Sequence, residues 1–268
     1  MSRTASIGKP RPTPEEIRKE VERLAQAAAG EWCPGGGWQF PYDFGHGITA
    51  PTYSPTQQMH IWRRDVMLQA VEKHFPGPRE GLSVLDLGSG EGAMAIGLWE
   101  LGFRDITCVE VRPLNIEKAQ FAARVFGAEL DFIESDLTSF LADCTQTYDV
   151  VMFMGILYHI LDPFTVLKQI GEKTRSLMVL ETVISVPKGE GFQNAPHYAP
   201  TEAAFYLRVD CNASHTAGLS DYELWPTRSA VEMLLKYAGF TSLRELTGPD
   251  PVPDYFADGT RMIAVAAK

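Results

Sequence analysis

Long basic runs are missing from this 268-residue chain. Acidic residues outnumber basic ones by 34 to 24, and the formal net charge is −10. The longest run of Lys or Arg is the pair Arg63-Arg64. Proteins that bind polyanions usually present a basic face, because neutralising phosphates releases counterions. The composition therefore disfavours nucleic acid as a partner.

Cysteines and long apolar runs are also scarce. The four cysteines, Cys33, Cys108, Cys144 and Cys211, are widely spread and form no C-x-x-C motif, which disfavours a metal site and a disulfide framework. No apolar run reaches the roughly 18 residues that a membrane span needs, and residues 1–13 lack the apolar segment of a signal peptide. We therefore expect a cytoplasmic protein with no membrane partner.

Residues 1–80 are predicted to form a helical extension that caps the rest of the chain. Thr13 and Glu16 have the spacing of a capping box at the start of a helix. Gly, Pro and aromatic residues then form a segment that cannot be a regular element, and we expect it to be an ordered loop. The expected order is a helix over 14–29, the aromatic loop over 32–53, and a helix after Ser54 that ends before Pro76.

From Ser83 onward, short apolar runs alternate with helical patterns, as in parallel α/β proteins. We predict an α/β fold over residues 81–268, with a doubly wound, seven-stranded, mostly parallel sheet. Residues 184–225 interrupt the alternation and are predicted to form a lid insertion over the substrate. The predicted strands are 83–87, 106–110, 130–134, 150–154, 177–181, 242–246 and 261–266, and the predicted helices are 92–101, 113–126, 162–170 and 228–238.

A glycine-rich turn, Asp86-Leu87-Gly88-Ser89-Gly90, follows the first of these strands. Doubly wound sheets bind ligands beyond the carboxyl ends of their strands, and glycines let the backbone approach a ligand closely. Glu110 ends the second strand about 20 residues later, where a carboxylate can accept hydrogen bonds from ribose hydroxyls. Asp136 follows the third strand and can accept from the exocyclic amine of adenine, with Leu137 against the ring. Capping a loop is the alternative role for Asp136.

The array V-L-D-L-G-S-G-E-G at 84–92, V-E-V at 109–111 and E-S-D-L at 134–137 resembles class I S-adenosylmethionine-dependent methyltransferases, which have a Rossmann-like fold. The resemblance implies that Gly88 and Gly90 flank the amino-acid end of the cofactor, that Glu110 holds the ribose and that Asp136 holds the adenine. It also implies S-adenosylmethionine as the cofactor. The other expected cofactor-binding residues are Asp86, Ser89, Val111, Leu137, Met154 and Trp62.

A second resemblance is to the methyltransferase branch that includes the bacterial tRNA wobble-uridine carboxymethyl transferases. It rests on M-F-M-G-I-L-Y-H at 152–159, D-P at 162–163, L-E-T at 180–182 and W-P-T at 225–227. Those enzymes hold a carboxylated cofactor with an N-terminal lysine, a tyrosine and a late arginine. Tyr158 and Arg261 match the last two, but residues 29–71 contain no lysine. The missing cation favours ordinary S-adenosylmethionine, and the acidic charge favours a small-molecule acceptor of the methyl group.

His159 and Tyr158 follow the fourth strand, at the rim where the methyl group should emerge. An imidazole can act as a general base toward a hydroxyl or ammonium acceptor near neutral pH. The ring of Tyr158 can attract a sulfonium. Core packing is the alternative role for both residues. His46, which lies between two glycines, is the second candidate base.

The insertion supplies four candidate substrate-binding residues, Tyr206, Arg208, Asn212 and His197. Tyr206 and Arg208 would share one face of an extended strand, which a face turned toward solvent explains equally well. Arg208 could hold a substrate carboxylate. Asp210 and His215 carry side chains that can ligate a metal, but a metal site is not expected. The alternative functions are an RNA-modifying methyltransferase and a noncatalytic cofactor-binding partner protein, and the sequence leaves a homodimer open.

Overall fold

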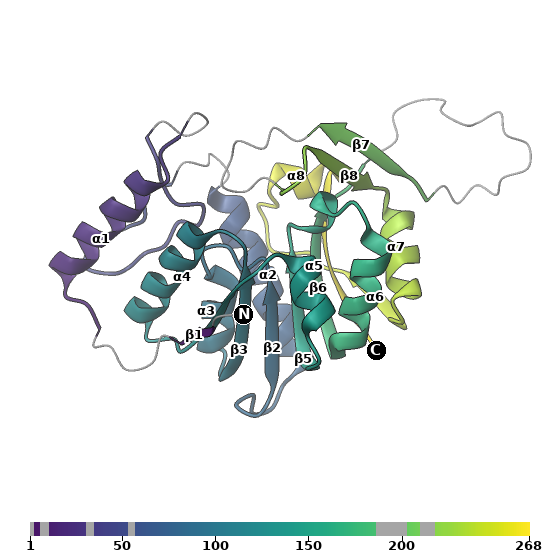
Figure 1. The fold of residues 1–268 in the computed structure, drawn as a ribbon, viewed down its shortest axis with the longest axis horizontal. Helices are drawn as coiled ribbons and strands as arrows, with labels where there is room; N and C mark the ends of the chain where they lie inside the picture. The colour runs from purple at the N-terminus through teal and green to yellow at the C-terminus, as the bar shows by residue number, and fades with distance from the viewer. Residues whose placement is uncertain (1–2, 6–10, 31–34, 53–56, 186–202, 210–217) are drawn as a thin grey trace, which may run out of the picture.

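The computed structural model describes residues 3–5, 11–30, 35–52, 57–185, 203–209 and 218–268. Its centre is one eight-stranded sheet in the order β1-β4-β3-β2-β5-β6-β10-β9 (Figure 1). The five strands from β4 to β6 are parallel, and β10 runs antiparallel to both β6 and β9. The strands are β1 (Arg3–Ala5), β2 (Ser83–Leu87), β3 (Asp105–Glu110), β4 (Asp131–Glu134), β5 (Tyr148–Met154), β6 (Thr174–Val183), β9 (Ser242–Glu245) and β10 (Arg261–Ala267).

The predicted doubly wound sheet is therefore confirmed, with one addition. The seven predicted strands are present, and β1 pairs antiparallel with β4 as an eighth strand at the edge. This strand is three residues long, which is too short for a pattern of alternating hydrophobicity to reveal it. Several other strands begin or end one to three residues away from the predicted bounds.

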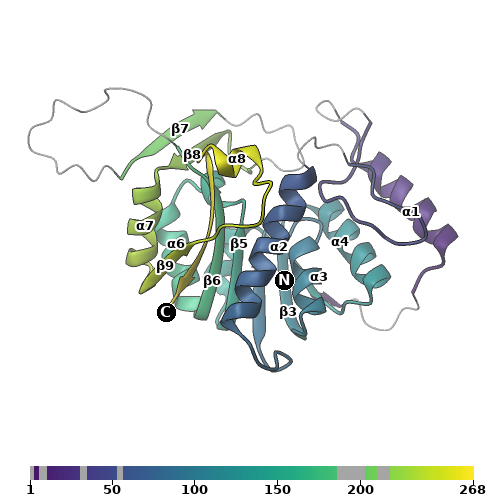
Figure 2. The same cartoon turned by 180° about the vertical axis from the view of Figure 1, so that it is seen from behind.

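Helices cover both faces of the sheet and enclose two hydrophobic cores. On one face lie α2 (Gln57–His74), α3 (Ala93–Glu100) and α4 (Pro113–Phe126), with α1 (Pro14–Ala27) packed outside α4 (Figure 2). On the other lie α5 (Leu137–Asp143), α6 (Pro163–Lys173) and α7 (Arg228–Tyr237) (Figure 1). The short elements are η1 (Leu157–His159), directly after β5, and α8 (Asp254–Ala257) before β10. Helix α5 was not predicted from the sequence.

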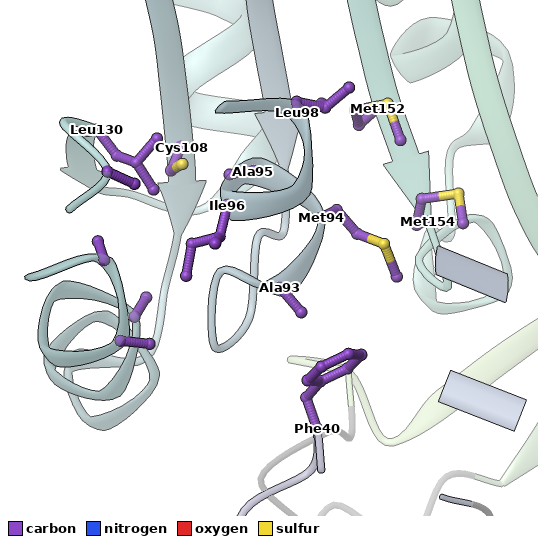
Figure 3. Close-up of a cluster of buried hydrophobic side chains, with 14 of the residues drawn as sticks. Phe40, Ala93, Met94, Ala95, Ile96, Leu98, Cys108, Leu130, Met152 and Met154 are labelled. Atoms are coloured by element: carbon purple, nitrogen blue, oxygen red, sulfur yellow. The ribbon is translucent and has the colours of Figure 1, made fainter. Parts of the chain in front are cut away.

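The N-terminal region packs onto the face that carries α4. The predicted capping box forms, because the Thr13 hydroxyl accepts from the Glu16 N–H and the Glu16 carboxylate accepts from the Thr13 N–H. The aromatic loop is ordered as expected over residues 35–52. Trp38 is fully buried, and its ring lies 6.4 Å from that of Phe121 on α4. Figure 3 shows Phe40 from the same loop beneath the first residues of α3.

The insertion contributes a separate two-stranded antiparallel sheet of β7 (Phe205–Val209) and β8 (Tyr222–Pro226). In Figure 1 this pair lies above the end of the main sheet, next to η1. The predicted lid residues 186–202 and 210–217 lie outside the described part of the chain. None of the helices in the described part is both long and apolar enough to cross a bilayer.

Candidate active site

Strand alternation brings several polar residues to one face of the sheet, at the carboxyl ends of the parallel strands. Asp86 alternates with Leu85 and Leu87, so it shares the face of Val84, which belongs to the core under α2 and α3. By the same alternation Glu110 and Glu181 lie on this face. Both carboxylates and Asp86 are buried. The local sequence therefore concentrates acidic groups where a doubly wound sheet binds its ligand.

A cavity of about 650 Å³ lies at these strand ends. Its walls come from the glycine loop, the ends of β3, β4 and β5, the first turns of α2, η1 and the segment before β8. The predicted site residues in its lining are Asp86, Gly88, Ser89, Gly90, Glu110, Val111, Asp136, Leu137, Met154, Tyr158 and His159. Eleven of the predicted residues thus meet in one place, although they are spread over more than seventy positions of sequence.

The backbone of the glycine loop explains its sequence. Gly88 and Gly90 have φ of 63° and 54°, in the left-handed region that favours glycine. A Cβ at Gly88 would lie 2.4 Å from Cδ1 of Ile156, so the close approach of the two segments also requires glycine. At Gly90 a Cβ would contact only Oε1 of Gln39, at a van der Waals distance of 3.8 Å. The loop therefore leaves room for a ligand beside Gly90.

Glu110 connects the glycine loop to the end of β3. Its Oε2 accepts from the Gly90 N–H at 2.8 Å, and its Oε1 accepts from the Val111 and Arg112 N–H groups at 3.0 and 2.9 Å. Three backbone donors therefore fix the orientation of this carboxylate. Oε2 accepts only one of these hydrogen bonds, so its second lone pair can accept from a ligand hydroxyl. The geometry suits the predicted ribose contact, which stays a prediction.

Asp136 is the N-cap of α5, which was its alternative role. Its Oδ1 accepts from the Ser139 N–H at 2.9 Å, and this hydrogen bond lowers the pKa of the carboxyl. Asp136 also lines the cavity together with Leu137. Capping occupies one oxygen of the carboxylate, so the cap and the predicted adenine contact are compatible.

The carboxyl group of Asp86 lines the cavity and has one oxygen without a hydrogen-bond partner among the described residues. Its Oδ2 is buried and accepts no hydrogen bond within the described part of the chain. Burial, and secondarily the charge of Glu110, raises the pKa of Asp86 from 3.8 to about 7. A buried carboxylate without a partner is unfavourable, so this site favours a ligand that brings a cation or a hydrogen-bond donor.

We predict that Asp86→Asn stabilises the unliganded protein in a pH-dependent way. Because the pKa of Asp86 is higher in the folded chain, the residue's contribution to stability is greatest below about pH 4 and falls as the pH rises to about 7. The gain in unfolding free energy from the substitution should be roughly 2 to 3 kcal/mol larger at pH 8 than at pH 5. Urea denaturation of both proteins at the two pH values measures this difference. Equal gains at both pH values would contradict the raised pKa.

A buried ion pair that was not predicted from the sequence holds the aromatic loop against the glycine loop. Glu91 accepts from the N–H groups of Gln39 and Phe40 and from Nζ of Lys118, at 2.8–3.0 Å. Lys118 also donates to the Gly37 carbonyl at 2.6 Å. Both side chains are nearly inaccessible, with 4% and 1% exposure. A lysine on the apolar face of a predicted helix is the sequence signal that could have found it, because buried lysines need a partner.

A second buried cluster closes the far end of the cavity, at β6 and β10. Arg63 on α2 and Arg261 on β10 donate to different oxygens of Glu181, Arg63 at 3.1 Å. Arg261 also donates to the Tyr158 hydroxyl at 3.5 Å, and burial raises the pKa of that phenol. Arg63, Tyr158 and Arg261 line the cavity. The N-terminal region therefore supplies an arginine to this cluster, although residues 29–71 contain no lysine.

His159 is paired with a carboxylate from the insertion. Its Nδ1 lies 3.3 Å from Oε1 of Glu223 on β8, and the other oxygen of Glu223 accepts from the Trp225 indole at 2.7 Å. The imidazole also packs against the Tyr158 ring, with centroids 4.1 Å apart. His159 lines the cavity on the η1 side. The imidazole thus lies beside a carboxylate at the rim where a base is predicted.

Four residues that were predicted for the site lie away from this cavity: Trp62, His46, Tyr206 and Arg208. The Trp62 indole donates to the Pro249 carbonyl at 3.0 Å and packs on Phe256, since His60 and Arg63 occupy the side of α2 that meets the cavity. His46 is exposed in a turn, with φ of 55°. Tyr206 and Arg208 are exposed on β7, where the Arg208 guanidinium lies 4.1 Å from the Trp225 ring. His197 and Asn212 lie outside the described residues.

A family model described as a methyltransferase domain matches residues 59–241. The chain belongs to this methyltransferase family. It is 29% identical over 177 residues to a ubiquinone biosynthesis O-methyltransferase of Cereibacter sphaeroides, covering 63% of this chain and 65% of that protein. A protein of the same name from Parvibaculum lavamentivorans is 26% identical over 231 residues, covering 85% of this chain and 82% of the relative. The chain thus spans just under two thirds of the first relative.

Solved structures agree on the fold of this methyltransferase. The N-terminal domain of EvdMO1 with S-adenosylhomocysteine (SAH) bound has a TM-score of 0.70 and 21% identity, covering 97% of this chain and 99% of that one. The same domain in the presence of SAH and D-fucose has a TM-score of 0.69. The predicted class I fold is confirmed. The unpaired Asp86 oxygen, the room beside Gly90 and the oriented Glu110 carboxylate fit S-adenosylmethionine, the cofactor predicted from the sequence.

Proposed function

We propose that this methyltransferase transfers the methyl group of S-adenosylmethionine to an oxygen of a small organic acceptor. The pairing of His159 with Glu223 in the wall of the cofactor cavity carries this proposal. A hydroxyl acceptor must lose its proton, and an oriented imidazole can take it. The relatives named as O-methyltransferases support oxygen as the accepting atom.

The residues of this chain have three tasks in such a reaction. The bound cofactor supplies an electrophilic methyl group on a sulfonium. Asp86, the glycine loop and Glu110 fix one reactant, and η1 with residues 218–220 limits the approach of the other. Most of the acceleration arises from this positioning. His159 removes the acceptor's proton at one ring nitrogen, while Glu223 beside Nδ1 holds the ring and stabilises the imidazolium.

Incubation with methyl-labelled S-adenosylmethionine tests the proposal directly. A panel of catechols, phenols and sugars that includes D-fucose should contain at least one compound that gains the label on oxygen, identified by mass spectrometry and NMR. Label found on carbon or nitrogen of the product would overturn oxygen as the acceptor atom. Label transferred to RNA in place of every small molecule would overturn the acceptor class.

For the base, we predict that His159→Asn lowers kcat by about 10²- to 10⁴-fold and leaves SAH affinity unchanged. His46→Asn is the matched control, because His46 is exposed and outside the cavity, and asparagine tolerates its positive φ. Steady-state kinetics and calorimetry on both variants separate the two effects. Unchanged turnover in the His159 variant would reduce that residue to a packing role.

We further propose a methyltransferase branch, a class of partner and a lid for this chain. Tyr158 and Arg261 support kinship with the wobble-uridine carboxymethyl transferase branch, and the net charge of −10 supports a small molecule over a nucleic acid as partner. Residues 218–220 line the cavity, which supports the role of the 184–225 insertion as a lid over an N-terminally extended methyltransferase domain. A cytoplasmic location, a homodimer and the expected lack of a metal remain predictions.

A further inference from the structure

The segment Trp225-Pro226-Thr227 ends strand β8 and leads into α7. Its backbone is tied to the body of the protein, because the Ser185 N–H donates to the Pro226 carbonyl at 2.8 Å. The Thr227 N–H donates to the Ala204 carbonyl at 2.9 Å, and the Thr227 hydroxyl accepts from the Ala204 N–H at 3.1 Å. Trp225 therefore projects from a fixed piece of backbone at the anchored end of the β7–β8 pair.

Trp225 shares one face of β8 with Glu223, because side chains two positions apart on a strand point to the same side. The Trp225 indole N–H donates to Oε2 of Glu223 at 2.7 Å, and Oε1 of the same carboxylate lies 3.3 Å from Nδ1 of His159. The guanidinium of Arg208, on the paired strand β7, lies 4.1 Å from the Trp225 ring and restrains it from that side. Trp225 and Glu223 thus connect the β7–β8 pair to the imidazole.

The His159 imidazole is also packed against two neighbours. The centroid of the Tyr158 ring lies 4.1 Å from its own, and a Cβ at Gly218 would lie 2.9 Å from Nδ1. The segment before β8 therefore approaches the imidazole too closely for any residue except glycine. These contacts restrain where the ring lies, but they do not determine which ring nitrogen carries the proton.

The carboxylate of Glu223 determines the position of that proton. A carboxylate beside Nδ1 favours the tautomer with the proton on Nδ1, which leaves the lone pair of Nε2 to take a proton. The His159 and Glu223 side chains are only 12% and 14% exposed, so water screens their interaction little. His159 lines the cavity, whereas Glu223 and Trp225 do not. Any effect of these two side chains on a ligand therefore passes through the imidazole.

We propose that Trp225 is a positioning residue, whose indole N–H holds Glu223 beside Nδ1 and thereby keeps Nε2 of His159 able to accept a proton. The inference rests on the proposed function, in which His159 is the base. The acceptor's O–H bond breaks, its proton bonds to Nε2, and the electron pair left on oxygen attacks the methyl group and displaces SAH. Without the indole N–H, the Glu223 carboxylate turns toward water and no longer fixes the tautomer.

Steady-state kinetics on Trp225→Phe tests this link, because phenylalanine keeps an aromatic ring beside Arg208 and removes the N–H donor. With the panel compound that gains the label, kcat should fall about 10-fold, as expected for one lost hydrogen bond to a charged group. KM for that compound and the affinity for SAH should stay within about two-fold. In a His159→Asn background the same substitution should leave kcat unchanged. A further fall in that background would show a general structural role and overturn the proposal.

NMR of the unliganded, full-length protein labelled with ¹⁵N-histidine gives a readout that needs no acceptor. The ring signals of His159 are those missing from the spectrum of His159→Asn. At about pH 9, where imidazoles are neutral, the wild type should show the tautomer protonated on Nδ1. In Trp225→Phe the ratio of the two tautomers should change about 5-fold or more toward Nε2 protonation. An unchanged ratio would overturn the proposal.

Trp99→Phe is the matched control. Trp99 on α3 lies 4.2 Å from the guanidinium of Arg104 and does not line the cavity, so this variant also loses an indole stacked on an arginine. Its kcat and its His159 tautomer should equal those of the wild type. If Trp225→Phe folds poorly, Glu223→Gln tests the same link, because its amide oxygen still accepts from the indole while the charge is gone. Its kcat should fall about 10-fold or more, and full turnover would overturn the proposal.

Failure of this proposal differs from failure of the proposed function. Lost turnover in His159→Asn with normal turnover in Trp225→Phe would leave the base in place and remove the positioning role. Conversely, a His159 tautomer that depends on the Trp225 indole, in a protein that methylates no small hydroxyl compound, would support the link and sink the proposed function.

Discussion

Replacing Glu110 with alanine should lower the affinity for S-adenosylmethionine by about 100-fold or more. The substitution removes an acceptor for the ribose hydroxyls and, at the same time, the acceptor of the Gly90, Val111 and Arg112 N–H groups. A hydrogen bond to a charged group contributes about 1.5 to 3 kcal/mol, so losing the ribose contact together with the backbone contacts that hold the glycine loop accounts for this change. Calorimetry should show micromolar affinity for the wild type.

Glu134→Ala is the control for this prediction. Glu134 ends the neighbouring strand β4 and is the register partner of Glu110, but it is exposed and does not line the cavity. Its loss should leave the affinity within about two-fold, as expected for a surface substitution. Equal affinities of the Glu110 variant and the wild type would show that the ribose lies elsewhere.

Replacing Lys118 with methionine should lower the free energy of unfolding by roughly 3 to 5 kcal/mol, because it leaves the buried carboxylate of Glu91 without its cation. The substitution also removes the donor to the Gly37 carbonyl, so the aromatic loop loses a direct hydrogen bond to α4. Urea denaturation of the unliganded protein measures the loss. The Gln39 and Phe40 segment lines the cavity, so weaker cofactor binding should accompany it.

Two further variants test whether the loss of stability is specific to the buried pair of Glu91 and Lys118. Arg23→Ala breaks the exposed contact between α1 and Glu117 on α4, and should change stability by less than about 1 kcal/mol. Combining Lys118→Met with Glu91→Gln should recover part of the lost stability, because no buried charge is then left alone. A loss of less than 1 kcal/mol in the Lys118 variant would mean that water reaches Glu91.

The glycine loop, Glu110 and Asp136 could be predicted from the sequence because the relevant signals are local. Each stands directly after a short apolar run, and parallel strands bring all their carboxyl ends to one edge. Knowing the strands therefore sufficed to predict that these residues meet. The capping box at Thr13 is equally local, and it forms as predicted.

Helix α2 contains a residue, Trp62, whose burial could be predicted from the sequence but whose neighbours could not. Its apolar stripe predicts correctly that Trp62 is buried, but the helix is buried on more than one side. Trp62 faces Phe256 while Arg63, the next residue, faces the cavity. Periodicity distinguishes buried from exposed positions and does not identify the neighbour that buries them.

The α/β class, the strand ends that form the cavity and the residues that follow them could all be predicted from the sequence, because spacing and alternation act over a few residues. The pairings across the chain depend on how the elements pack. Glu91 with Lys118, Glu181 with Arg63 and Arg261, and His159 with Glu223 join elements from different layers. The physical reason is that a buried charge requires some partner, but only the packing of one element on another determines which residue provides it.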